Sequence, residues 1–174
     1  MFALLVAVLI QPAPAPTVVT LGTLKAAAPA TWKSGKPSNL LRSHQFSIAA
    51  ADPEIAPAEV AVFKEASPKV EEKFAEWKAT FVIPDGKTAD DLGAKTDEFT
   101  VADATVHTLD VSGTWKYRER PRDPKSKQEL RPDTRVLWVV LIQKEETTHI
   151  RLAGPAAVVN KHAAEFLTWI KSAK

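Results

Sequence analysis

The chain has 174 residues, of which 45% are hydrophobic and 25% are charged, and its 23 basic and 21 acidic side chains leave a net charge of +2. This length suits one domain with a sizeable core. Charges of both signs are interleaved along most of the sequence, which excludes the strongly basic surface of a typical nucleic-acid-binding protein. The chain has no cysteine, so disulfides, thiolate zinc sites and a cysteine nucleophile are excluded.

The first ten residues form an uncharged apolar run, and residues 11–16 after it are rich in proline and alanine. The run is too short to span a bilayer as a helix, which needs ~20 residues, but it matches the apolar part of a secretory signal. A buried first strand is the alternative, because no basic residue precedes the run and Pro16 would hinder cleavage after Ala15.

We therefore expect residues 1–16 to be a signal peptide or a disordered segment and residues 17–174 to be one domain. The mature protein is expected to begin between residues 12 and 24 and to be periplasmic or secreted to the extracellular space. No integral membrane span is expected in the mature chain.

The first part of the domain alternates strands and turns. Residues 17–24 are predicted to be a strand, and residues 29–37 a loop that carries Trp32, because they contain two prolines and a glycine. Residues 40–49 and 59–64 are rich in apolar residues and flank a proline-containing turn, which predicts a hairpin.

A helix is predicted to follow, with Ser67 as its N-cap and Pro68 at its first helical position. One apolar stripe runs along it at helical spacing, formed by Val70, Phe74, Trp77 and Phe81. The residues Pro84-Asp-Gly86 are typical of a turn and are predicted to end the helical segment. Residues 88–95 are mostly polar, which predicts a loop or one short helical turn.

Residues 99–101 and 104–117 are predicted to be a second hairpin around Ala102-Asp103. Its longer strand places one set of alternate residues on a buried face, namely Leu109, Val111, Gly113, Trp115 and Tyr117. Residues 118–133 include three prolines and are predicted to be a sixteen-residue loop.

Residues 136–142 are seven consecutive apolar residues, four of them β-branched. Such a run is typical of a central strand covered on both faces. A turn at Glu145-Glu146 leads to a strand over residues 148–152. Gly154-Pro155 then opens the last helix, whose predicted core stripe is Val159, Ala163, Phe166 and Ile170, with Leu167 beside it.

These elements predict an α+β fold, a mainly antiparallel sheet of six or seven strands with two main helices packed on it. No cofactor or metal is expected. His44, His107, His149 and His162 lack the close spacing of a zinc site, although the first three can meet across a sheet. Asp90-Asp91 with Asp97-Glu98 does not match a calcium loop and is interpreted as solvated. No nucleophile elbow or phosphate-cradling glycine pair occurs.

The best candidate for an interaction surface is the predicted loop, which has six basic residues between positions 118 and 131. Long loops in compact domains are often functional. The predicted binding residues are three arginines of this loop and the two aromatics at its base: Arg118, Arg120, Arg122, Trp115 and Tyr117. A solvated hairpin tip, with both aromatics in the core, is the alternative.

Scattered motifs resemble a group of uncharacterised exported bacterial proteins over most of residues 22–173. They are Pro29-Ala-Thr-Trp32, Lys36-Pro-Ser-Asn39, Glu76-Trp77, Phe81-x-x-Pro84-Asp-Gly86 and Asp110-Val-Ser-Gly-Thr114. The overall plan is similar to the PsbP-like fold, an antiparallel sheet between helical layers. That fold is non-catalytic in the photosystem subunit it is named for, which implies a binding or assembly role here. The resemblance carries over no functional residue.

The preferred hypothesis is a non-catalytic extracytoplasmic binding or accessory module, whose partner is an envelope protein or an acidic ligand and not a nucleic acid. The alternatives are a metal-dependent hydrolase that uses His107, Asp110 or His149, and a structural component of the cell envelope.

Overall fold

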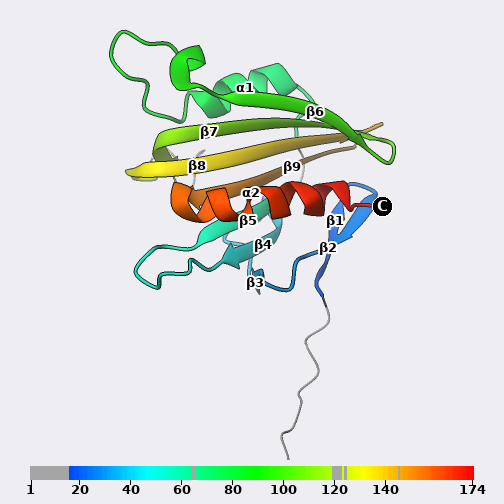
Figure 1. Cartoon of the computed structure of the whole chain (residues 1–174). Helices are drawn as coiled ribbons and strands as arrows, with labels where there is room; N and C mark the ends of the chain where they lie inside the picture. Colours follow the sequence, from blue (N-terminus) through cyan, green and yellow to red (C-terminus); the bar gives the residue numbers. More distant parts are fainter. Residues whose placement is uncertain (1–15, 64–65, 119–122, 124, 145) are drawn as a thin grey trace, which may run out of the picture.

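The computed structural model describes residues 16–63, 66–118, 123, 125–144 and 146–174. Over these residues the chain forms an antiparallel seven-stranded sheet, a two-stranded hairpin and two α-helices packed on the sheet (Figure 1). This confirms the predicted α+β fold. The strands of the large sheet lie in the order β3 (Lys33–Gly35), β4 (Arg42–Ile48), β5 (Ala58–Phe63), β9 (Glu146–Pro155), β8 (Gln128–Gln143), β7 (Ala104–Arg118) and β6 (Lys95–Val101).

Strand β8 lies inside the sheet, and residues 136–141 are each at most 4% exposed. Successive side chains of a strand point to opposite faces. Accordingly, Leu137, Val139 and Leu141 belong to one core cluster, whereas Val136, Trp138 and Val140 belong to another. The prediction of a central strand covered on both faces is therefore confirmed.

Helix α2 (Ala156–Lys171) covers the face that carries Leu137. The side chains of its predicted core stripe, Val159, Ala163, Phe166 and Ile170, are all buried. The helix begins one residue later than predicted, so Pro155 is its N-cap and not its first helical residue. Strand β9 continues through Pro155, which pairs with Thr134 of β8, and the helix starts only where this pairing ends.

Helix α1 (Val70–Lys78) lies on the opposite face, with Phe74 buried against Trp138 and its neighbours. The predicted N-cap is wrong, because the helix begins at Val70 with Lys69 as its N-cap. Ser67 instead accepts a hydrogen bond from the backbone N–H of Lys69 at 3.3 Å, while its carbonyl oxygen lies 2.9 Å from Nε2 of His149. These contacts hold Ser67 against the sheet, outside the helix.

The first predicted strand, residues 17–24, is instead part of a hairpin of β1 (Val18–Leu21) and β2 (Leu24–Ala27). The turn requires glycine, since Gly22 has φ of +65° and a Cβ there would lie 2.3 Å from Oε1 of Gln143. The predicted loop at residues 29–37 contains β3, and its Trp32 is buried in the core beneath α2.

The predicted loop over residues 118–133 is shorter than expected, because β8 begins at Gln128 and pairs with β7 as far as Arg118. Pro132 lies where the register shifts, between the pairs Trp115↔Arg131 and Gly113↔Thr134. A bulge leaves a residue without a ladder partner, so proline is tolerated there. We call residues 114–118 and 128–132 the β7–β8 arm.

Helix α1 ends at Lys78, so Phe81 of its predicted stripe lies outside the helix and forms a bridge with Trp115. The other elements lie where they were predicted, although β6 begins at Lys95 and not at residue 99. Strands β4 and β5 form the first predicted hairpin, and β6 and β7 form the second. The single helical turn predicted within residues 88–95 is the 3₁₀ turn η1 (Ala89–Leu92). Residues 1–15, on which the predicted signal peptide falls, lie outside the described residues. In the part of the chain that is described, no helix has the length and apolar character needed to cross a membrane.

Candidate functional site

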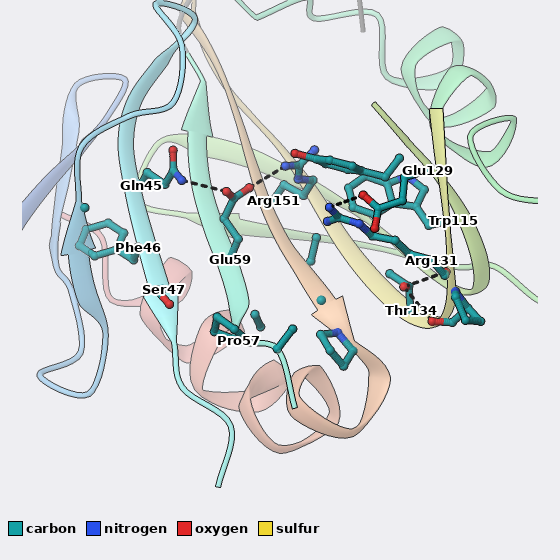
Figure 2. Close-up of a pocket in the computed structure, with 18 of the residues that line it drawn as sticks. Gln45, Phe46, Ser47, Pro57, Glu59, Trp115, Glu129, Arg131, Thr134 and Arg151 are labelled. Atoms are coloured by element: carbon teal, nitrogen blue, oxygen red, sulfur yellow. Dashed lines mark hydrogen bonds and ion pairs between the residues drawn. The ribbon is translucent and has the colours of Figure 1, made fainter. Parts of the chain in front are cut away.

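The face of the sheet that carries α1 has two halves of different character. Beneath α1, strands β7 and β8 supply apolar residues such as Leu109, Val111 and Val136 to the core. Over β4, β5 and β9 the same face is hollowed into a cavity of about 600 Å³, which we call the main cavity (Figure 2). This volume lies within the range of about 300–1,000 Å³ that is common for small-molecule sites.

One wall of the main cavity is the β7–β8 arm. The pairs Trp115↔Arg131 and Tyr117↔Glu129 place these four side chains on one face of the arm, and all four line the cavity. The guanidinium carbon of Arg131 lies 3.5 Å from the ring centroid of Tyr117, and the Tyr117 ring meets that of Trp115 edge to face at 5.0 Å.

The arm is held at its outer edge by the segment that follows α1. The backbone N–H of Val82 donates to Thr114 at 2.9 Å, and that of Lys116 donates to Thr80 at 2.8 Å. The indole N–H of Trp115 also donates to the Thr80 hydroxyl at 3.1 Å. These bonds give the wall a fixed position relative to the rest of the sheet.

The opposite wall contains a charged cluster built by Arg42 of β4, Glu59 of β5 and Arg151 of β9. Glu59 lies 2.7 Å from Nη1 of Arg42 and accepts a hydrogen bond of 2.8 Å from Nη2 of Arg151. Gln45 adds a donor, with its Nε2 at 2.9 Å from Oε2 of Glu59. Figure 2 shows Glu59 between Gln45 and Arg151 on the cavity wall.

This cluster keeps its charges at neutral pH. Burial acts to raise the pKa of Glu59, but the charges of Arg151 and Arg42 outweigh it, and the pKa is held below its ordinary value. Burial lowers the pKa of Arg151, and the nearby Glu59 carboxylate opposes that effect. Because arginine titrates far above neutral pH, Arg151 stays a cation.

A second cavity of about 540 Å³ lies on the other side of Trp115 and Arg151, since these two residues line both cavities. Its walls include Phe63, Trp77 and Trp138, and the two indoles stack at 5.3 Å with an angle of 6°. The guanidinium carbon of Arg151 is 5.1 Å from the Trp115 ring. This cation–π pair therefore separates the two cavities.

The structure places three of the five predicted binding residues beside these cavities. Trp115 lines both cavities, Tyr117 lines the main cavity, and Arg118 lines the second one. Arg120 and Arg122 lie outside the described residues. Trp115 is also buried in the core, as the alternative interpretation expected, so it serves both packing and the cavity wall.

The residues proposed for a metal-dependent hydrolase are not brought together. His107 and His149 flank Val140 across β7, β8 and β9, but Asp110 pairs with Arg135, which contacts Asn160 of α2 on the opposite face. His44 shares the face of buried Phe46, beneath α2. Within the described residues, no group of three or more histidine, aspartate or glutamate side chains has the geometry of a metal site.

The acidic loop residues have structural partners. Asp91 closes a capping box with Thr88 at the start of η1, and Asp90 forms an ion pair with Lys78 at 2.5 Å. Hydrogen bonds from Thr88 lower the pKa of Asp91.

Sequence reasoning missed Glu59, Arg151 and Arg42, which form the charged wall. Glu59 and Arg151 are 92 positions apart, and cross-strand pairing over that distance has no local signal. One signal was present: Arg151 lies between Ile150 and Leu152, which are both fully buried, in a strand at the centre of the sheet. A charge inside such a strand faces either a partner or a cavity.

Comparison with protein-family models gives no match, and comparison with curated proteins gives none either. Among solved structures, the crystal structure of PA94 from Pseudomonas aeruginosa, a protein of unknown function, is similar to this chain with a TM-score of 0.49. The two sequences are 12% identical, and the match covers 91% of this chain and 96% of that chain.

Proposed function

We propose that the chain is a non-catalytic binding module that holds a small organic ligand in the main cavity, and that it works outside the cytoplasm. The observation that carries the proposal is the construction of this cavity. Its two walls come from separate parts of the sheet, each wall is held by its own hydrogen bonds, and polar and apolar groups of both walls face the same space.

The cavity is ready to bind without rearrangement of the fold. Glu59, Gln45 and Arg151 fix one another on one wall, and the arm on the other wall is bonded to residues 80–82. Such support is typical of binding sites because it avoids the entropic cost of ordering side chains when the ligand arrives. The apolar N-terminal run is what supports a place outside the cytoplasm.

The test is a screen of small organic compounds by ligand-observed NMR, with variants that fill the main cavity. Ser47→Phe places a ring in the cavity from β4, and Ala56→Phe does so from an exposed loop position. The matched control is Ser112→Phe, which adds the same ring on the opposite face of the sheet, beside Arg135.

We expect compounds that bind the wild-type protein to lose binding to both cavity-filling variants and to keep binding to the control. Melting temperatures of the three variants show that each is folded. The proposal is overturned if no compound binds the wild-type protein, or if the bound compounds are insensitive to both cavity-filling substitutions.

A further inference from the structure

We infer that the ligand of the main cavity is a small organic monoanion, a carboxylate carried on an apolar body. The inference rests on the proposed function and names the class of ligand for the same site. It follows from the charge of the walls, from the unused hydrogen-bonding capacity of their arginines, and from the aromatic lining.

The charge at the cavity is unbalanced by one positive unit. The described residues that line the cavity carry two arginines, Arg131 and Arg151, and two carboxylates, Glu59 and Glu129. The excess comes from Arg42, which lies behind the wall against Glu59 with its side chain 4% exposed. One carboxylate would neutralise this excess. A cationic ligand would increase it, and a doubly charged phosphate would reverse it, so charge complementarity favours a monoanion.

The hydrogen-bonding groups of the charged wall also favour a negatively charged ligand. Both oxygens of Glu59 are occupied, one by Arg151 and the other by Arg42 and Gln45. Each guanidinium has several N–H donors, but the Nε atoms of Arg42 and Arg151 are shielded from solvent, and of these two arginines only Arg151 lines the cavity. The donors that this wall presents to the cavity are therefore the Nη groups of Arg151, and its carboxylate is already saturated, which suits an acceptor ligand.

Arg131 offers a second guanidinium from the arm. Its Nη2 donates to the exposed carboxylate of Glu129 at 2.9 Å, and its stacking on Tyr117 holds the guanidinium plane against the cavity wall. The rest of its planar fork is free of any described partner. Arginine forks bind carboxylates through paired hydrogen bonds, which gives geometric specificity as well as affinity.

The remaining lining accounts for the apolar body. Trp115 and Tyr117 present large rings, and Leu130, Pro57 and Ala153 add aliphatic surface. Rigid aromatic side chains bury a large ligand area at a small cost in conformational entropy. A ligand with a ring or short chain can thus pack against the arm while its carboxylate reaches the guanidinium groups.

The test compares matched pairs of probes by isothermal titration calorimetry. The carboxylates are benzoate, naphthalene-2-carboxylate and octanoate, and each is paired with its primary amide, which keeps the shape but lacks the charge. 2-Naphthyl phosphate tests a doubly charged group on the same ring. We expect a carboxylate to bind about tenfold or more tightly than its amide, because charge-assisted bonds to arginine need the negative charge. It should also bind more tightly than the phosphate, whose second charge exceeds the positive excess at the cavity.

Two variants locate the effect. Arg131→Gln should weaken carboxylate binding about tenfold or more and leave amide binding unchanged. Lys95→Gln also removes one positive charge, but Lys95 is exposed on β6 and lines neither cavity, so both affinities should stay at the wild-type value. Equal loss in the two variants would show a general charge effect and would overturn the inference.

The outcomes separate this inference from the proposed function. If amides bind as tightly as carboxylates and the Ser47→Phe variant abolishes both, the cavity binds ligands but does not select anions. If the phosphate binds most tightly, the monoanion is wrong. If neither probe series binds at millimolar concentration, the inference fails, and the compound screen alone decides whether the proposed function stands.

Discussion

The strongest quantitative prediction concerns Glu59, because two buried arginines depend on its carboxylate. Glu59→Gln keeps the shape of the side chain but removes its charge and turns one acceptor into a donor, which then faces an arginine. A charge-assisted hydrogen bond contributes about 1.5–3 kcal/mol. The hydrogen bond from Arg151 and the ion pair with Arg42 are both weakened. The Glu59 side chain is 31% exposed, so solvent screens part of the loss, and we expect a net cost of about 3 kcal/mol.

The assay is urea unfolding followed by tryptophan fluorescence, together with thermal melting. For a chain of this size about 3 kcal/mol corresponds to a fall in melting temperature of roughly 6–12 °C. Glu129→Gln is the matched control, because it makes the same chemical change in an exposed pair with Arg131. Exposed pairs contribute little to stability because solvent screens them, so the control should lose little.

The pH dependence provides an independent check. The folded-state pKa of Glu59 lies below its ordinary value of 4.5, so its contribution to stability is fully present above about pH 4.5 and is lost as the pH falls through the folded-state pKa. The stability gap between wild type and Glu59→Gln should therefore be constant near neutral pH and shrink in acid. A gap no larger than that of Glu129→Gln, or a gap that grows in acid, would refute the description of this cluster.

Three further predictions follow. Phe166→Ala should cost about 3–5 kcal/mol in urea unfolding, because the ring is fully buried. Trp77→Ala should cost less, because this ring is only half-buried, although it contacts Phe74, Trp138 and His149. Equal losses would show that Trp77 is packed as deeply as Phe166. Mass spectrometry of the native protein should find a mature N-terminus between residue 12 and Val18, because β1 packs Val19 and Leu21 into the core. An intact Met1 in a cytosolic fraction would contradict export. Replacing Arg118, Arg120 and Arg122 with serine should leave the melting temperature nearly unchanged and should weaken salt-sensitive binding to envelope extracts. Binding that survives intact would show that the loop is not the contact surface.

Much of the fold was predictable because its signals are local. The apolar run at residues 136–142 indicated a strand covered on both faces, and the stripe from Val159 to Ile170 indicated the buried face of α2. Periodicity records which side of an element is buried, and each element has one such side. The two hairpins were predictable for the same reason, since alternation and turn residues lie within a few positions of each other.

Errors arose where a residue has a second, distant partner. Ser67 has the side chain of an N-cap, but its carbonyl is bonded to His149, and the helix begins later. Pro132 predicted a loop, but the register shift beside Arg131 gives the proline a place within β8. In both cases a local preference gave way to pairing with another strand, which short-range patterns do not describe.

Some residues of the candidate site could likewise be identified from the sequence, and others could not. Trp115 and Tyr117 were identifiable from the sequence as aromatics at the base of a basic segment, and they line the main cavity. Glu59 and Arg151 were not identifiable, because a charge in a strand has no marked partner until the strands are ordered. The sequence by itself determined which faces of the elements are buried. The tertiary structure alone, by placing β5 beside β9 and folding the β7–β8 arm over them, decided which polar groups meet in one cavity.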